Sequence, residues 1–226
     1  MPRESYQKQL DDLRENVLYM SEVVLERLRW GLDALERKDE DLAWDVIEGD
    51  DEINEMYLEL EQDCIDLLAL QQPVAGDLRF IAASFKIITD LERVADLATN
   101  LGEYTHDAER DLYPGVDVQG IGDATAEMVE DAMDAYAAED ADACVEIAER
   151  DDEIDRGCER ASTIVMRDLI ESEFETDGDE REIELLMQDV SRLLLTIRDL
   201  ERVGDHAVNI AARTRYMVEN DDSLIY

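Results

Sequence analysis

The chain has 226 residues, of which 61 are Asp or Glu and only 21 are Lys or Arg, so its formal charge is −40. A surface this acidic repels phosphate backbones and anionic lipids, which argues against general binding to nucleic acids or membrane surfaces. Hydrophobic residues make up 45% of the chain, enough for a substantial core, so the composition excludes a wholly disordered protein.

The basic residues are also unusual, because only three of the 21 are lysines. High acidity with little lysine indicates adaptation to a salt-rich cytoplasm, where the Debye length is about 3 Å at 1 M salt and self-repulsion is screened. The charged N-terminal segment contains no apolar signal sequence, and the longest uncharged run, 67–76, is shorter than a membrane-spanning helix requires. We therefore expect a soluble, cytoplasmic protein.

Three helices are predicted in the first half of the chain. Apolar residues recur at steps of three and four over about 5–37, then over the segment that follows Asp39, and again over about 76–108. Asp39 is a typical N-cap for the second helix, and Pro73 with Gly76 separates the second helix from the third. The first half is therefore expected to form a three-helix bundle.

The pattern of the first half starts again after a turn-rich segment, which is typical of an internal duplication. The sequence DDEIN at 50–54 recurs as DDEID at 151–155, an offset of 101 residues. DLERV at 90–94 recurs unchanged at 199–203, an offset of 109 residues, and the extra eight residues fall in the polar loop 171–182.

These patterns predict an all-α protein built from two tandem three-helix bundles related by pseudo-two-fold symmetry. The first repeat is expected to cover residues 1–112 and the second residues 124–226. The segment 113–123, YPGVDVQGIGD, is rich in turn residues and is interpreted as the linker between them.

Four carboxylates, two in each repeat, stand where the apolar stripe of a helix requires a hydrophobic residue. In the second helix of each repeat these are Asp50 and Asp151, and in the third helix they are Glu92 and Glu201. Steps of four keep the next polar residues on the same helix face. Those next residues are Asn54, Asp155, Asp96 and Asp205, followed one turn later by Asn100 and Asn209.

A carboxylate on a packed helix face must be paired, protonated or bound to a metal, because burying it alone is costly. Two such groups on neighbouring helices repel each other unless a cation lies between them. Ligation by oxygen alone favours a hard metal ion such as Mg, Mn, Ca or oxidised Fe over zinc. Two alternatives stay open: that Arg93 and Arg202 neutralise these acids in ion pairs, or that this part of the stripe faces solvent.

Motifs for catalysis are weak or incomplete. Glu103 and His106 have the Glu-x-x-His spacing of ferritin-like di-iron sites. The second motif that such a site needs is missing, because Val203 stands three residues before His206. A metal-dependent enzyme on the same scaffold, a ferroxidase or a hydrolase, is therefore kept only as an alternative function.

Two segments of the repeat resemble a known family. QQPVAGDLRFIAASFKIITDLERVADLATNL (71–101) and its echo RDLERVGDHAVNIAA (198–212) are similar to the PhoU family, and the similarity extends over essentially the whole chain. The resemblance implies two three-helix bundles side by side, usually in a homodimer, whose acidic motifs bind single cations or multinuclear metal clusters.

By this resemblance the metal ligands come from the second and third helices of each repeat. The implied set is Asp50, Asn54, Glu92 and Asp96 in the first repeat and Asp151, Asp155, Glu201 and Asp205 in the second. Asn54 departs from the family pattern, which has a carboxylate at that position. Because Asn is a neutral and weaker ligand, we predict weaker cation binding in the first repeat.

The resemblance also implies a regulatory function without catalysis. PhoU-like proteins act with a phosphate-specific ABC transporter, and in many bacteria with a sensor kinase, to restrain phosphate uptake and the phosphate-starvation response. We therefore expect an accessory protein that negatively regulates phosphate uptake, with the ATPase subunit of the transporter as its partner. Service to another phosphate permease and a metal-free scaffold remain alternatives.

Overall fold

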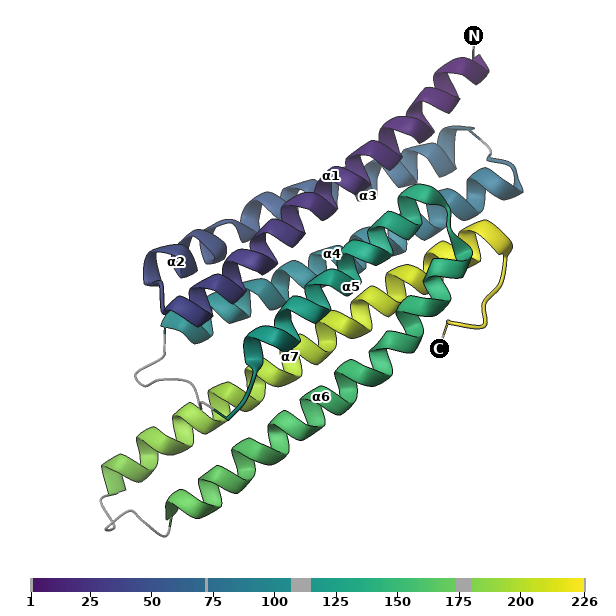
Figure 1. Cartoon of the computed structure of the whole chain (residues 1–226). Helices are drawn as coiled ribbons and strands as arrows, with labels where there is room; N and C mark the ends of the chain where they lie inside the picture. Colours follow the sequence, from purple (N-terminus) through teal and green to yellow (C-terminus); the bar gives the residue numbers. More distant parts are fainter. Residues whose placement is uncertain (1, 72, 107–114, 174–179, 226) are drawn as a thin grey trace.

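The computed structural model describes residues 2–71, 73–106, 115–173 and 180–225, and all regular secondary structure in these residues is helical, as predicted (Figure 1). The helices are α1 (Pro2–Arg37), α2 (Glu40–Glu48), α3 (Asp50–Gln71), α4 (Ala75–His106), α5 (Val118–Ala138), α6 (Ala141–Glu173) and α7 (Glu180–Glu219). No helix within the described residues is long and apolar enough to cross a membrane.

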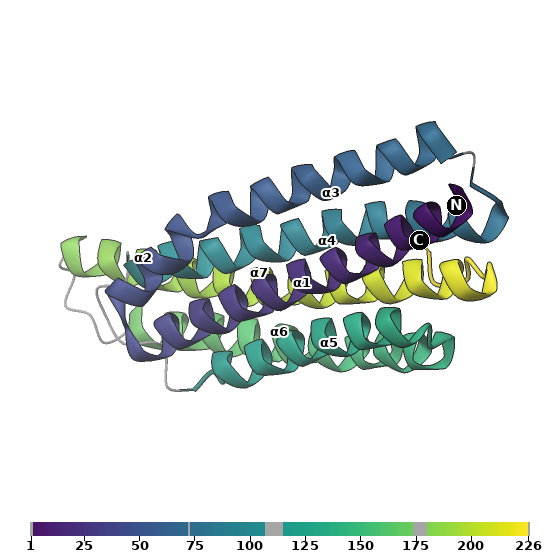
Figure 2. The same cartoon turned by 90° about the horizontal axis from the view of Figure 1, so that it is seen from above.

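The helices form two bundles, α1 to α4 and α5 to α7, that lie against each other along their length (Figures 1 and 2). Helices α4 and α7 pack side by side at the centre, and α1 also contacts α5. One continuous cluster of buried residues runs through both bundles, from Leu13 and Leu91 in the first to Tyr136 and Leu200 in the second. The two repeats therefore share a single hydrophobic core, and the predicted pair of three-helix bundles is confirmed.

The turn after the first helix has the same backbone conformation in both repeats. Lys38 and Glu139, which the offset of 101 makes equivalent, both lie in the left-handed region, at φ 53° and 54°. The next residues, Asp39 and Asp140, each accept a hydrogen bond of 3.1 Å from the backbone N–H three residues further on. Asp39 is thus the N-cap that the sequence predicts, and the duplication extends to the detail of the turns.

The second helix differs between the repeats. In the first repeat it is interrupted at Gly49 and continues as α3, whereas the equivalent Arg150 lies inside the unbroken α6. A Cβ at Gly49 would stand only 2.5 Å from Nε of Arg27, so a larger residue there would displace the Arg27 side chain. The single helix predicted after Asp39 is therefore two helices, and the break falls directly before Asp50.

Part of the predicted linker is helical. Within the segment 113–123, α5 begins at Val118, because Asp117 accepts a hydrogen bond of 2.9 Å from the N–H of Gly120 and caps the helix. The first two residues of that segment lie outside the described residues. The loop of the second repeat is also shorter than predicted at its edges, since α6 extends to Glu173 and α7 begins at Glu180.

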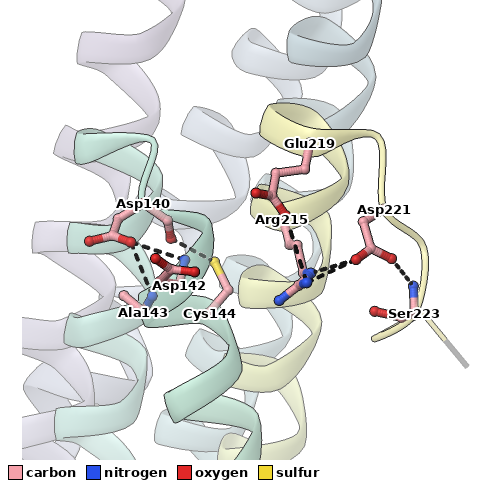
Figure 3. A network of polar contacts seen from close by, with 8 residues as sticks. All are labelled: Asp140, Asp142, Ala143, Cys144, Arg215, Glu219, Asp221 and Ser223. Carbon is pink, nitrogen blue, oxygen red and sulfur yellow. Dashed lines mark hydrogen bonds and ion pairs between the residues drawn. The ribbon is translucent and has the colours of Figure 1, made fainter.

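Hydrogen bonds and ion pairs join the end of α7 to the residues that follow it (Figure 3). Arg215 donates to Asp221 at 2.9 Å and lies 3.7 Å from Glu219, while Asp221 accepts from the N–H of Ser223. Cys144, at the start of α6, is close enough for its charge interaction with Arg215 to lower the thiol pKa, although burial raises that pKa overall to about 11. These contacts join the last turns of α7 to the residues that follow the helix.

Candidate metal centre

The structure gathers the eight predicted ligands into two groups, one in each repeat. The first cluster contains Asp50, Asn54, Glu92 and Asp96, contributed by α3 and α4. The second cluster contains Asp151, Asp155, Glu201 and Asp205, contributed by α6 and α7. In each cluster the two carboxylates on the apolar stripes are half-buried, and the second carboxylate of the third helix, Asp96 or Asp205, is exposed. Both clusters therefore open to solvent on one side.

In the first cluster the protein's own groups engage the acids. Asn54 donates from Nδ2 to Oδ2 of Asp50 at 2.8 Å, and Thr99 donates to the other oxygen of the same carboxylate at 3.4 Å. Arg93 lies with Nε 3.4 Å from Oε2 of Glu92. One of the two ion pairs considered from the sequence is thus present, although more than half of the Arg93 side chain is exposed and the pair is weak.

The charges around the first cluster come from both repeats. Burial, followed by the neighbouring Asp96, raises the pKa of Glu92 above its ordinary value. Burial and then Asp50 raise the pKa of Asp96, and nearby cations oppose this effect. Those cations are Arg93 of the first repeat and Arg202 of the second, so the second repeat contributes part of the first cluster's charge balance.

The second cluster is more strongly acidic. Burial, followed by the charges of Asp155 and Asp205, raises the pKa of Asp151 to about 6. The pKa values of Glu201 and Asp205 are raised by burial and then by Asp155. The charged groups that act on Asp151 are all carboxylates. A group whose neighbours all disfavour its ionised form is a strong attractor for a cation.

Two observations support the compatibility of the second cluster with a cation. Within the described residues, Oδ1 of Asp151 is buried and accepts no hydrogen bond. Gly204 leaves space beside the same atom, because a Cβ there would stand 3.2 Å from it, tighter than most such contacts. A buried carboxylate oxygen without a protein partner is uncommon, and an ordered water or a bound cation would satisfy it.

The clusters are loosely gathered. In the part of the chain that the structure describes, no group of three or more His, Cys, Asp or Glu side chains is already arranged to hold a metal ion. Binding would therefore require the exposed members, such as Asp155 and Asp205, to turn toward the half-buried ones. Exposed side chains have the rotamer freedom to do so on a nanosecond timescale.

The second ion pair considered from the sequence is absent from its expected place. Arg202 lies 3.5 Å from Asp199, whose carboxylate is completely buried. The sequence reasoning did not single out Asp199 or its counterpart Asp90 as site residues. It also placed Asn100 and Asn209 on the cluster face, whereas these amides donate to the two overlooked acids. The repeated Asp at the start of the motif was the signal that could have revealed them.

The incomplete di-iron motif lies apart from both clusters. His106 is exposed in the last turn of α4, and its ring packs against that of Trp44 with 5.0 Å between the ring centroids. Glu103 is likewise exposed. Nothing in this arrangement supports the ferroxidase alternative.

Comparisons with known proteins agree with the duplication. A family model described as the PhoU domain matches residues 17–105 and again 118–214. The chain is 34% identical over 222 residues to a "Phosphate-specific transport system accessory protein PhoU homolog" of Pseudomonas putida, covering 97% of this chain and 82% of that relative.

Two solved structures have the same fold. PhoU from Pseudomonas aeruginosa superposes with a TM-score of 0.82 at 32% identity, over 96% of this chain and 100% of that one. The phosphate transport system regulatory protein PhoU from Streptococcus pneumoniae gives a TM-score of 0.84 at 26% identity, over 96% of this chain and 98% of that one.

Proposed function

The chain belongs to the PhoU family, whose members are regulatory accessory proteins and not enzymes, and we propose that it restrains phosphate uptake in a cation-dependent manner. The cation would be held mainly by the second cluster. The name of the Pseudomonas putida relative assigns that protein to a phosphate-specific transport system, which supports the same assignment for this chain.

The observation that carries the cation-dependent part of the proposal is the unpaired carboxylate of Asp151. Its buried Oδ1 lacks a hydrogen-bond donor in the described residues, and its neighbours are other acids. Leaving such a group ionised and unpaired is costly, so the native chain gains stability from any cation that binds there. An all-oxygen ligand set is suited to Mg²⁺, Mn²⁺, Ca²⁺ or oxidised iron.

A bound cation would supply positive charge on a surface that is otherwise strongly acidic. The proposed ligands are Asp151, Asp155, Glu201 and Asp205, with the equivalent residues of the first cluster forming a weaker site. Phosphate, or an acidic segment of a partner protein, could then dock where the chain alone would repel it. This gives the cation a regulatory function without any chemical step.

We further propose the ATPase subunit of a phosphate transporter as the partner, with a sensor kinase as a second partner in some cells and a homodimer as the active form. These assignments rest on the family. The charge of −40 and the scarcity of lysine support a salt-rich cytoplasm as the setting, because salt there screens the repulsion that such a chain would otherwise feel.

The function can be tested in cells that lack the gene for this chain. Phosphate uptake is expected to rise on deletion and to return to normal with the native chain, but not with Asp151→Asn combined with Glu201→Gln. Glu153→Gln removes an exposed acid from the same helix and should restore normal uptake. Unchanged uptake on deletion would contradict the regulatory function, and full restoration by the double variant would contradict its dependence on a cation.

A further inference from the structure

The duplicated motif contains two residues that the clusters do not use. On α4 the motif begins with an Asp before the two candidate ligands and ends with an Asn after them, and α7 repeats this order. The four residues are Asp90 and Asn100 on α4, and Asp199 and Asn209 on α7.

Each Asn reaches the Asp of the other repeat. Asn100 donates from Nδ2 to Oδ2 of Asp199 at 3.0 Å, and the hydroxyl of Tyr104 donates to the same oxygen at 2.8 Å. Asp199 is completely buried, so these bonds replace the water that its carboxylate has lost. Burial, followed by the bond to Asp199, raises the pKa of Tyr104 to about 12, which keeps the hydroxyl protonated as a donor.

The equivalent contact, from the Asn of the second repeat to the Asp of the first, lies at the other end of the interface between α4 and α7. Asn209 donates from Nδ2 to Oδ1 of Asp90 at 3.3 Å, and Nδ1 of His206 lies 2.9 Å from that oxygen. The two sets of contacts require α4 and α7 to run antiparallel, with each helix bonded to the other at two separate points. We name this set of six residues the cross-repeat clasp: Asp90, Asn100, Tyr104, Asp199, His206 and Asn209.

The clasp encloses the candidate ligands of both repeats. Glu92 and Asp96 lie between the two clasp points of α4, which are ten residues or about 15 Å of helix apart. Glu201 and Asp205 lie between the equivalent points of α7. A helix segment fixed at both ends to its neighbour cannot shift toward a cation without moving that neighbour.

We propose that the cross-repeat clasp couples the two clusters, so that a cation bound in one repeat strengthens cation binding in the other. This inference rests on the proposed cation sites and adds a function for residues that bind no cation themselves. Asn100 and Asn209 are positioning residues, because they act through the helices that hold the ligands.

The sign of the coupling follows from the order of events. The first cation must draw loosely gathered side chains together and order the helix segment that holds them. Because the clasp transmits that order, the second cation binds to a chain that is already arranged for it, which gives positive cooperativity. Direct repulsion between the two cations has the opposite sign and is largely screened at 1 M salt.

The test uses calorimetric titration of the whole chain with Mn²⁺ in 1 M KCl. Single-site affinities come from two variants, Glu92→Gln with Asp96→Asn, and Glu201→Gln with Asp205→Asn. In the native chain we expect the product of the two stepwise binding constants to exceed the product of the single-site constants about fivefold or more, the lower end of typical couplings. With Asn100→Ala and Asn209→Ala added to every protein, the excess should fall below about twofold.

Further variants keep the test valid. Asn209→Ala alone leaves buried Asp199 fully paired, so it should fold normally and still reduce the coupling. Gln188→Ala, which removes an exposed amide elsewhere on α7, should leave the coupling unchanged. Two independent sites in the native chain, or equal coupling with and without the clasp, would overturn this inference alone. Absence of any Mn²⁺ binding would overturn the proposed cation sites as well.

Discussion

The two clusters occupy equivalent positions in a duplicated fold, yet they solve the problem of their negative charge differently. In the first cluster Asn54 replaces a carboxylate and donates to Asp50, and Arg93 lies beside Glu92. In the second cluster the equivalent of Asn54 is Asp155, and buried Oδ1 of Asp151 has no partner among the described residues. The protein's own groups compensate the first cluster, whereas the second keeps a carboxylate oxygen without such a partner and is therefore the proposed cation site.

Two further differences around the clusters also leave the second cluster with less compensation of its negative charge. Arg202, the equivalent of Arg93, pairs with Asp199 of the clasp, which removes it as a direct partner of Glu201. Gly204 leaves space beside Asp151, and its equivalent in the first repeat is Ala95. The duplicated motif thus keeps most of its carboxylates in both copies, while different surroundings leave the two clusters with different charge compensation. We expect the second cluster to be the tighter cation site.

The largest effect is expected from Asp151→Asn. Loss of this half-buried carboxylate should weaken the tighter Mn²⁺ binding by about 100-fold, since even the loss of a ligand's hydrogen-bonding partner costs about 10- to 100-fold. The matched change Asp50→Asn, in the first cluster, should leave the tighter binding within a few fold of native. Calorimetry on the two variants measures both effects, and equal losses would remove the distinction between the clusters.

A charge exchange should reverse the ranking of the two clusters. Asn54→Asp adds a carboxylate to the first cluster and Asp155→Asn removes one from the second. Each change is expected to alter the affinity of its own site by about tenfold, because ligand charge sets cation affinity in oxygen-ligand sites. The site occupied first can be followed by titrating Mn²⁺ into the exchange variant and recording paramagnetic broadening of nearby amide signals. Preferential broadening around α6 and α7 in that variant would be the contrary result.

Gly204→Ala probes the space beside Asp151. The added Cβ would lie 3.2 Å from Oδ1, so the carboxylate must move to accept it. We expect Mn²⁺ binding at the second cluster to weaken by about threefold, a fraction of the 1.4 kcal/mol that corresponds to tenfold. Gly157→Ala, where the nearest atom to the new Cβ is 3.9 Å away, is the matched control on α6 and should have no effect. An equal effect of both changes would point to helix propensity and not to the site.

The smallest effect concerns pH in the metal-free protein. The folded pKa of Asp151, about 6, lies above its ordinary value of 3.8, so the folded chain binds the proton more tightly than the unfolded chain. Stability should therefore increase as pH falls from 7 to 5, and the native chain should gain about 2–4 °C in Tm relative to Asp151→Asn over that interval. Thermal unfolding followed by circular dichroism measures this difference. A parallel pH dependence in both proteins would show that Asp151 ionises without strain.

Much of the fold could be predicted from the sequence, because helical periodicity and the repeated motifs are local signals. Asp39 caps its helix as predicted, and the all-α pair of bundles follows from the duplication. The break at Gly49 was not predicted, because the apolar stripe of the sequence continues across it from Val46 to Ile53. The grouping of the cluster carboxylates could also be predicted, because carboxylates on an apolar stripe stand out against its period, whereas their function as cation ligands stays a prediction.

The cross-repeat clasp could not be predicted from the sequence, because it depends on how distant segments pack. Asp199 is fully buried between α4 and α7, but which face of α7 meets the other repeat is decided by packing between distant segments. The sequence shows that Asp90 and Asp199 recur, and it does not show that each one meets the Asn of the opposite repeat. For the same reason the sequence could not show that Arg202 pairs with Asp199, and pairing with the acids of its own cluster stayed open as an alternative.

The central claim, that the second cluster is the principal cation site, is tested most directly by anomalous X-ray scattering. Crystals of the protein would be equilibrated with increasing Mn²⁺, and anomalous difference maps would be calculated at each concentration. The first peak is predicted among Asp151, Asp155, Glu201 and Asp205, with a peak at the first cluster only at higher concentration. A first peak beside Asp50 and Glu92, or no peak at either cluster at saturating Mn²⁺, would contradict the claim.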